Sequence, residues 1–471
     1  MLKRLLRKIK NNLIFLVLIA LISALVYVGF VYIFHKPSFE LFAKDTISYS
    51  GLKATINTEN VSIVSIHISG SKDGTNLVDI YKQEEFLDGG NQINIEIKFK
   101  TNSPVVKMIR SENIDHFYLH YSISYKNSFF TSFIKDEIKL KIDFDPPKIS
   151  NIRSDGYIYQ GGIGYVLYDT SVDAIKSYVD TGVGKMFYPI SILKDEKISN
   201  LVFFTCSNLP CKNNKIIVVA EDRSGNKVSL SKKINTLSKK AWPTSDIKIN
   251  SKFLLMKYNE IKKDNKTSAG LKEFRELNIN ERAKNDQLLT MKTEKIRNEL
   301  LFNGKFVQMK NSKVFSTYSE KRNYFIDGIE GSVDSKYHLG IDLASTANAK
   351  VNPSNRGIVS YVDNDGLGIY GKSIVIDHGL GFYTLYSHLN TISVGIGEKV
   401  DTDSVIGNTG STGYAFGDHL HFATYIQGVS FNPIELFDSK YINLKIIKIY
   451  KEFIKEQPKW LYMVKTQLKI L

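Results

Sequence analysis

An uncharged apolar stretch near the N-terminus restricts what this chain can fold into more than any other feature of the sequence. Residues 13–34, LIFLVLIALISALVYVGFVYIF, contain no charged side chain. A run of this length can cross a bilayer as a helix. Five basic residues precede it: Lys3, Arg4, Arg7, Lys8 and Lys10. The positive-inside rule then predicts a cytoplasmic basic tail (1–12), a transmembrane anchor (13–34) and an exported body.

A cleaved signal peptide is the competing interpretation of the same stretch. The apolar run continues past Ala24, however, and no clear A-x-A cleavage site precedes His35. We therefore expect a single-pass anchor in the cytoplasmic (inner) membrane, with the C-terminal body in the periplasm or extracytoplasmic space. The net charge of +15 favours an anionic partner. For an exported body this means membrane lipid or wall polymer, and we expect no nucleic-acid partner.

Two successive regions have the alternating apolar and polar pattern of β-strands. Residues 35–144 contain segments such as INIEIKFK and FYLHYSISY separated by turn-rich pieces. Residues 145–240 open with DPP and close with AEDRSGN, and they resemble bacterial immunoglobulin-like domains. We expect two β-sandwich-like domains, in which His67, His116 and His120 are ordinary strand residues. An envelope protein that binds these domains is a partner we leave open.

The two cysteines of the chain, Cys206 and Cys211, lie in the segment TCSNLPC. No histidine is nearby, so a structural zinc site is a poor explanation for them. In an oxidising exported compartment a disulfide across this short loop is feasible, and two free thiols are the alternative. Neither alternative indicates catalysis.

Helical patterns occupy two other parts of the chain. Residues 250–303 are rich in Lys and Glu, with apolar residues recurring every three or four positions, which predicts a helical connector whose charges form a solvated face. Residues 439–471 contain many Lys interspersed with apolar residues. This composition predicts a basic amphipathic C-terminal tail, lying either on an anionic membrane or on the protein's own surface.

Five of the nine histidines fall between His338 and His421, and this clustering indicates chemistry. His338 and Asp342 are four residues apart in YHLGIDLAS, so both side chains share one face of a strand or helix. His419 and His421 in GDHLHF likewise share one face of a strand. Two imidazoles and one carboxylate suit Zn²⁺, and a set of three ligands leaves the fourth position open. His338, Asp342 and His421 are therefore the candidate ligands of one zinc ion.

Two histidines remain for proton transfer. His388, in YTLYSHLN, is the candidate base toward a water molecule, and His419 is the candidate proton donor to the oxyanion or leaving amine. No HExxH motif is present, which excludes the arrangement in which a glutamate is the base.

Residues 304–438 resemble the lysostaphin/LytM-type zinc peptidases that cut peptidoglycan. The resemblance rests on the H-x3-D pair, on IVIDHGLGFYTLYSHL (374–389) and on IGNTGSTGYAFGDHLHF (406–422). It implies an antiparallel β domain with zinc at the floor of a groove, with His338, Asp342 and His421 as ligands and His388 and His419 as catalytic residues. His378 matches the pattern as a residue that is not a ligand. Asp418 and Ala423 depart from it without removing a functional group.

We thus expect a mainly β protein: an N-terminal transmembrane helix, two β-sandwich-like domains, a helical connector and an antiparallel β LytM-type peptidase domain. The expected function is a membrane-anchored zinc metallo-endopeptidase acting on peptide stems of peptidoglycan in cell-wall remodelling. The favoured bond is the D,D cross-link, D,D-carboxypeptidase trimming is a second activity, and glycyl-glycine cleavage is less favoured. The alternative is a catalytically silent LytM-like binding protein that activates a wall amidase. A structural adhesin would leave the histidines unexplained. If the helical connector lay over the groove, one of its acidic side chains could occupy the open zinc position and make the enzyme latent.

Overall fold

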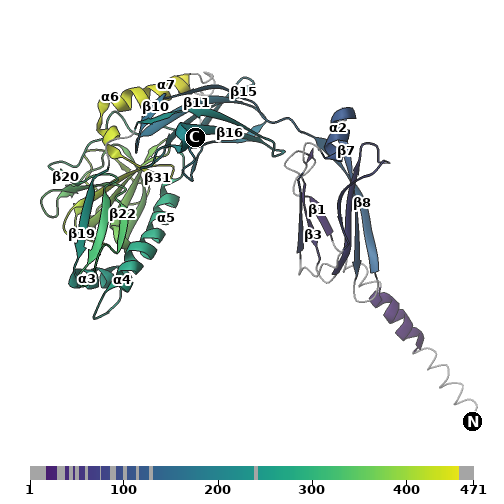
Figure 1. The fold of residues 1–471 in the computed structure, drawn as a ribbon, viewed down its shortest axis with the longest axis horizontal. Coiled ribbons are helices and arrows are strands. Elements are labelled where there is room, and N and C mark those ends of the chain that lie inside the picture. Colours follow the sequence, from purple (N-terminus) through teal and green to yellow (C-terminus); the bar gives the residue numbers. More distant parts are fainter. Residues whose placement is uncertain are drawn as a thin grey trace, which may run out of the picture. The chain divides into compact units, whose positions relative to one another are not determined.

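The computed structural model describes residues 17–28, 38–41, 46–47, 52–58, 62–74, 76–84, 92–98, 103–112, 116–126, 131–237 and 242–455. The chain divides into two compact units, Met1–Pro146 with Asp222–Lys227, and Pro147–Glu221 with Val228–Leu471 (Figure 1). As predicted, the fold is mainly β, and most strand pairs are antiparallel.

The predicted transmembrane span lies only partly within the described residues. Residues 17–28 are helical, and most of their apolar side chains are exposed. Residues 1–16 and 29–34 lie outside the described residues. Within the part that is described, no helix is both long enough and apolar enough to cross a membrane. The anchor therefore stays a prediction.

Among the described residues of the first unit, two sheets and one helix besides that of residues 17–28 share a single core. Strands β1 (Ser38–Leu41), β3 (Leu52–Asn57) and β6 (Gln92–Ile97) form one sheet, and β2 (Thr46–Ile47), β8 (Thr131–Ile142), β7 (His116–Lys126), β4 (Ser62–Ser71) and β5 (Val78–Gln83) form the other. Helix α2 (Pro104–Glu112) adds buried Val105, Val106 and Ile109 to the core. In β7 every second side chain, from Phe117 to Tyr125, is buried, which is the period expected of a strand with one face on a core.

The second unit begins with two four-stranded sheets. One has the order β14 (Ile190–Lys194), β15 (Lys197–Thr205), β11 (Ile163–Ser171), β9 (Ile149–Ser154), and the other β13 (Met186–Phe187), β12 (Ala174–Asp180), β16 (Lys215–Asp222), β17 (Lys227–Lys233). Short strands β10 (Tyr157–Tyr159) and β18 (Asn235–Leu237) pair beside them. We call this part the middle sandwich. Cys206 and Cys211, both buried in it, form a disulfide.

A helical segment follows the middle sandwich, with α3 (Ser251–Lys262), α4 (Leu271–Arg275), η2 (Glu276–Glu281) and α5 (Arg282–Thr293). Helix α3 begins where the Asn250 side chain accepts a hydrogen bond from the backbone N–H of Phe253, a common N-cap arrangement. The segment packs beside a small sheet of β19 (Thr244–Ile249), β21 (Lys321–Ile326) and β22 (Asp334–Tyr337). It is therefore part of the second unit's core and not a free linker.

A large sheet forms the centre of the second unit. Its order is β20 (Lys313–Ser316), β23 (Ile341–Ala344), β30 (Leu420–Ile426), β27 (Phe382–Ile392), β26 (Gly371–Gly379), β25 (Gly357–Leu367), β28 (Lys399–Val400), with β24 (Lys350–Val351), β29 (Gly407–Thr409) and β31 (Val429–Phe431) attached. In β30, Leu420 and Phe422 belong to one core, and Ala423 and Tyr425 to the core that contains the helical segment. Because side chains alternate along a strand, His421 lies on the face that the helices cover.

The middle sandwich and the large sheet share a third hydrophobic core. The rings of Phe203 in β15 and Phe382 in β27 have centroids 5.4 Å apart, and the backbone N–H of Ile163 donates to Glu435 at 3.0 Å. The regions we predicted as separate domains, 145–240 and 304–438, therefore share one hydrophobic core.

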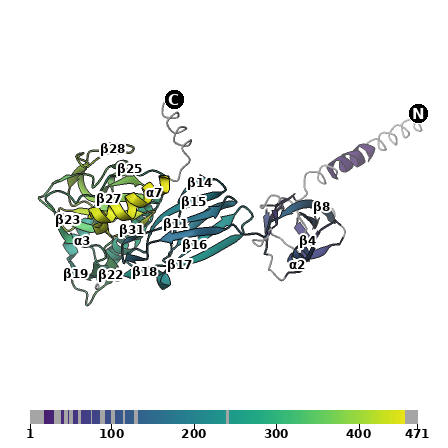
Figure 2. The ribbon, with the colours of Figure 1, turned by 90° about the horizontal axis from the view of Figure 1, so that it is seen from above.

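The C-terminal tail is helical as far as it is described, in α6 (Ser439–Tyr441), η5 (Ile442–Ile447) and α7 (Lys448–Lys455) (Figure 2). Ile446, Ile449 and Phe453 are buried in the core shared with the middle sandwich. For residues 439–455 the structure thus shows the second of our two alternatives, a helix packed on the protein itself. Residues 456–471 lie outside the described residues.

Candidate active site

The pairing of four strands sets a row of polar side chains across one face of the large sheet. Asp342 in β23 pairs with Ser316 in β20 on one side and with His421 in β30 on the other. His421 in turn pairs with Ser387 in β27. Residues directly opposite each other in neighbouring strands point to the same face. Register alone therefore brings Asp342 and His421 together from positions far apart in the sequence.

Three predicted ligands meet at one point, as the sequence led us to expect. His338 Nε2 lies 3.1 Å from Asp342 Oδ1 and 3.0 Å from His421 Nδ1, and His421 Nδ1 lies 3.0 Å from Asp342 Oδ1. All three side chains are buried. They form the one group of three or more potential metal ligands found among the described residues.

The spacing of these three atoms fits a small metal ion. Ligand atoms in a tetrahedral zinc site are about 3.3 Å apart, since each lies about 2.0–2.1 Å from the metal. The other nitrogen of His338, Nδ1, lies 3.1 Å from the carbonyl oxygen of Thr317, which can only accept. Nδ1 therefore carries the proton, and the lone pair of Nε2 points toward the other two ligands, as a metal-binding histidine requires.

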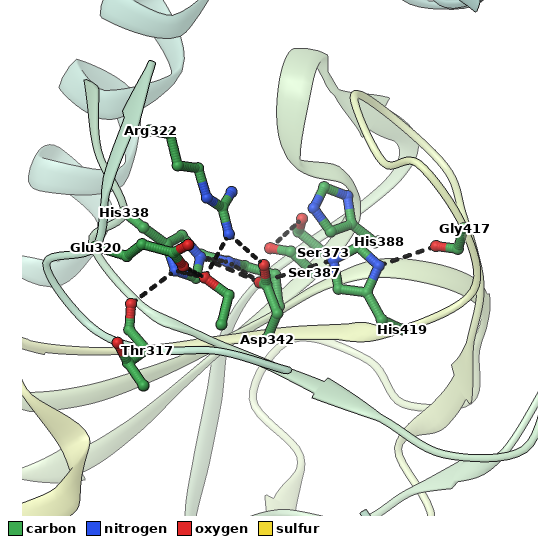
Figure 3. A network of polar contacts seen from close by, with 12 residues as sticks. Thr317, Glu320, Arg322, His338, Asp342, Ser373, Ser387, His388, Gly417 and His419 are labelled. Carbon is green, nitrogen blue, oxygen red and sulfur yellow. Dashed lines mark hydrogen bonds and ion pairs between the residues drawn. The ribbon is translucent and has the colours of Figure 1, made fainter. Parts of the chain in front are cut away.

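Arg322 holds the second oxygen of Asp342 and was not predicted from the sequence. Its Nη2 donates to Asp342 Oδ2 at 2.6 Å and to Ser316 Oγ at 2.7 Å (Figure 3). Ser316 also contacts Nδ1 of His338 at 3.1 Å. Burial alone would raise the pKa of Asp342, but facing His338 and His421 hold it well below its ordinary value. The Asp342 carboxylate is thus ionised, and contacts to both of its oxygens hold it in place.

His388 reaches the pocket because the backbone departs from regular strand geometry. A regular strand would turn His388 away from the face that carries Ser387. His388 has φ +62°, a left-handed conformation that costs energy for a side chain of this kind, and its ring lies 5.9 Å from that of His421. Its Nδ1 lies 2.8 Å from the carbonyl oxygen of Thr412, so this nitrogen is the donor and Nε2 is the basic one. Burial lowers the pKa of His388 well below its ordinary value, so the ring is neutral.

His419 stands beside His388 at the mouth of the site, with ring centroids 4.9 Å apart. Its Nδ1 donates to the carbonyl oxygen of Gly417 at 2.9 Å, and its Nε2 is 3.6 Å from Asp342 Oδ1. His378 in β26, by contrast, is buried and does not line the pocket described below; its two ring nitrogens contact the Arg356 carbonyl and the Thr384 hydroxyl, each at 2.7 Å. His378 is therefore a structural residue, as expected.

A pocket of about 590 Å³ opens over this cluster. Its wall contains all four histidines of the site, and three aromatic side chains at its edge are largely exposed: Phe315, Tyr337 and Phe416. Asn208 of the middle sandwich also lines the pocket, as do Arg282 and Asp286 of α5. Our prediction that the connector's charges form only a solvated face is wrong at these two positions.

The acidic residue of α5 that lines the pocket does not join the three ligands. Asp286 Oδ1 accepts a hydrogen bond from the Tyr370 hydroxyl at 2.8 Å. Among the described residues, the potential metal group contains no acidic side chain from 250–303. Whether the connector makes the enzyme latent stays a prediction, but a carboxylate of this segment in the ligand group is not what the structure shows.

Comparison with known proteins agrees with this geometry. Residues 336–433 match peptidase family M23. This segment is an M23 peptidase domain. It contains all five predicted site residues, whereas Arg282, Ser316 and Arg322 lie before it.

Curated relatives of the M23 domain include named peptidoglycan enzymes. The DD-carboxypeptidase/endopeptidase Mpg of Neisseria meningitidis is 37% identical over 101 residues, which cover 21% of this chain and 23% of that protein. The peptidoglycan DD-endopeptidase ShyA of Vibrio cholerae is 35% identical over 98 residues, or 21% of this chain and 22% of that protein. This chain thus spans about a quarter of the length of these relatives.

Among solved structures, the catalytic domain of lysostaphin from Staphylococcus simulans is 26% identical, with 27% of this chain and 92% of that chain covered and a TM-score of 0.23.

Proposed function

We propose that this chain is a zinc metallo-endopeptidase that hydrolyses peptide cross-links of peptidoglycan. The observation that carries the proposal is the buried group of His338, Asp342 and His421, whose ligand atoms are 3.0–3.1 Å apart. Two further histidines, His388 and His419, line the same pocket with a ring nitrogen available for proton transfer. A binding module has no need for this second pair.

The residues of the site divide the chemistry between them. When bound, a zinc ion supplies Lewis acidity, which polarises an amide carbonyl and lowers the pKa of water. Nε2 of His388 accepts a proton from the attacking water, because its Nδ1 is already a donor to Thr412. His419, once protonated at Nε2, donates this one proton either in a hydrogen bond to the oxygen that gains negative charge or by transfer to the leaving amine. Arg322 keeps the Asp342 carboxylate oriented throughout.

The substrate we propose is the D,D cross-link between D-alanine and diaminopimelate, with trimming of a terminal D-alanine as a second activity. Two relatives of the M23 domain have names that specify DD-endopeptidase activity. The net charge of +15 suits an anionic polymer. We further propose that residues 13–34 anchor the protein in the cytoplasmic membrane with its body outside. Protease added to spheroplasts should then digest the body while the extreme N-terminus stays protected.

The function is tested with the full chain, loaded with zinc, and purified peptidoglycan. Muropeptide analysis should show cross-linked dimers falling and monomers rising, and metal analysis should show one zinc ion per chain. The matched control is His388→Ala, which keeps the three ligands and should leave dimers intact. A zinc-loaded protein that binds peptidoglycan without changing its dimers would favour the alternative, a catalytically silent activator of a wall amidase.

A further inference from the structure

Helix α5 contributes a cation, Arg282, to the pocket wall. This residue lies outside the M23 domain. Arg282 is the first residue of α5, lines the same pocket as the histidines, and precedes the matched segment 336–433 by more than fifty positions in the sequence. It is partly buried. A charged side chain in such a place needs partners, because taking a charge from water is costly unless it is paired.

The partners that the protein provides leave most of the Arg282 guanidinium unsatisfied. Nε and Nη2 both point to one atom, Asn278 Oδ1, at 3.3 and 2.8 Å. Arginine has five N–H donors in a planar fork. The other two cations of the pocket have ion pairs, Arg322 with Asp342 at 2.6 Å and Lys336 with Asp334 at 3.5 Å. Among the described residues, no carboxylate lies within 4.0 Å of Arg282.

A second unsatisfied donor lies in the same wall. Tyr414 is only 9% exposed, and its hydroxyl has no hydrogen-bond partner among the described residues. Tyr414 and Arg282 line the same pocket. Buried hydroxyls in native proteins are nearly always hydrogen-bonded. An orphan of this kind, in the lining of the same pocket as a cation for which no ion pair is found among the described residues, indicates a missing ligand atom that accepts hydrogen bonds.

We propose that Arg282 and Tyr414 form a binding subsite for a free carboxylate of the peptide substrate. A carboxylate is planar, accepts two parallel N–H bonds from arginine and keeps lone pairs for a hydroxyl donor. Asp286 attracts Arg282 by its charge from one helical turn away, but no hydrogen bond or ion pair joins these two side chains among the described residues, and Asp286 Oδ1 accepts from Tyr370. A cationic ligand is excluded, since it would face the Arg282 charge and offer no acceptor.

Tyr370 connects the subsite with the metal ligands. Its ring lies 5.6 Å from the ring of His421, and its hydroxyl donates to Asp286, which is one helical turn from Arg282 along α5. Arg282 and the three potential metal ligands line one pocket, so a peptide bound at the ligands can present a carboxylate to Arg282. We assign this carboxylate to the residue whose amine is released.

This assignment rests on the proposed function and makes the substrate class more specific. In a D-alanyl–diaminopimelate cross-link, the carbon attached to the scissile nitrogen bears a free carboxylate. The terminal D-alanine of an uncross-linked stem has the same feature, so one subsite serves both endopeptidase and carboxypeptidase cleavage. An internal glycyl-glycine bond has no carboxylate at this position. Arg282 thus selects D,D substrates over glycine bridges.

The test compares two substrates that differ in one group. The zinc-loaded full chain is given an acyl-D-alanyl-D-alanine peptide with a free terminal carboxylate and the same peptide with a carboxamide. Wild type should cleave the carboxylate form with a kcat/KM at least about tenfold higher, the range of a hydrogen bond to a charged group. In Arg282→Gln this ratio should fall to near one, and Tyr414→Phe should lower it in part. Lys284→Gln, an exposed change in the same helix, should keep the wild-type ratio.

The outcomes separate the subsite from the proposed function. A wild-type ratio near one, or an unchanged ratio in Arg282→Gln, overturns the subsite and leaves the peptidase intact. If wild type cleaves neither peptide, the carboxypeptidase activity fails while the endopeptidase is still decided by muropeptide analysis, and binding of the two peptides measured by calorimetry decides the subsite. Tighter binding of the carboxylate that disappears in Arg282→Gln supports it, and equal binding of both peptides rejects it. Circular dichroism of each variant identifies any loss of fold. If Arg282→Gln does not fold, the ratio measured for Tyr414→Phe decides instead: a lower ratio supports the subsite and an unchanged ratio rejects it.

Discussion

Replacing Gly340 by Ala should weaken zinc binding without touching a ligand. Gly340 lies between His338 and Asp342, against the ring of His421. A Cβ atom added there would stand 2.7 Å from His421 Cε1, 2.7 Å from the Phe422 carbonyl oxygen and 2.9 Å from His421 Nε2. The carbonyl belongs to β30, which pairs with β23 at this point, so relieving both contacts displaces the imidazole and also strains the pairing of these strands.

The size of the effect follows from these distances. Carbon atoms in contact are normally about 3.5 Å apart or more, so the His421 ring must shift by about 0.8 Å. Metal–ligand distances tolerate only about 0.2 Å. Overpacking of a tight site costs about 1–3 kcal/mol, and if the metal site carries this cost, zinc affinity falls by about fivefold to 150-fold.

The assay is a zinc competition titration of the full chain against a chromophoric chelator. The matched control is Gly417→Ala, at the edge of the same pocket, because a Cβ at Gly417 would meet nothing within 4 Å. The control should bind zinc like wild type. Zinc affinity of Gly340→Ala within twofold of wild type would refute the reasoning, as would an equal loss in the control.

Three further predictions have defined outcomes. His338→Ala should lose zinc and activity together, whereas His388→Ala should lose turnover and keep zinc; metal analysis and turnover that show the reverse would contradict the assigned roles. Arg322→Gln should weaken zinc binding by about tenfold to 100-fold, because it removes the hydrogen bond that orients Asp342; the exposed Lys321→Gln is the control, and tighter zinc binding would mean that charge repulsion outweighs orientation. Burial lowers the pKa of His378 from 6.5 to about 4, so the unfolded chain binds the extra proton first and stability should fall by about 3 kcal/mol as the pH drops from about 6.5 to about 4. Urea unfolding of wild type and His378→Gln across this range should show that the free energy of unfolding depends less steeply on pH in the variant. Equal slopes would count against a lowered pKa of His378.

Local spacing was enough to predict that the three candidate ligands come together, and the reason is the strand register. His338 and Asp342 are four residues apart, and Asp342 lies directly opposite His421 across β23 and β30. The His338–Asp342 motif and His421 therefore needed only the pairing of β23 with β30 to come together. The proton-transfer assignments of His388 and His419 still await their experiment.

Other parts of the site could not be predicted because they depend on long-range pairing. Arg322 reaches Asp342 through the pairing of β20 with β23 and the turn that leads into β21, and its own segment, KRNYFI, contains no motif. Arg282 looks like one charge among many in a Lys/Glu-rich helix. Only the packing of α5 on the large sheet distinguishes it from a solvated residue.

The core shared by the middle sandwich and the large sheet has a consequence for biosynthesis. Ile163 bonds to Glu435 and to Tyr441, which are 272 and 278 positions further along the chain. A ribosome releases the sandwich strands long before the residues that cover them, and contacts over such separations form slowly. The core of the middle sandwich therefore stays incomplete, with Phe203 uncovered, until nearly the whole chain has emerged. Folding of the second unit and assembly of its candidate metal site thus become one late event, and a chain truncated before residue 435 would be left with an uncovered core.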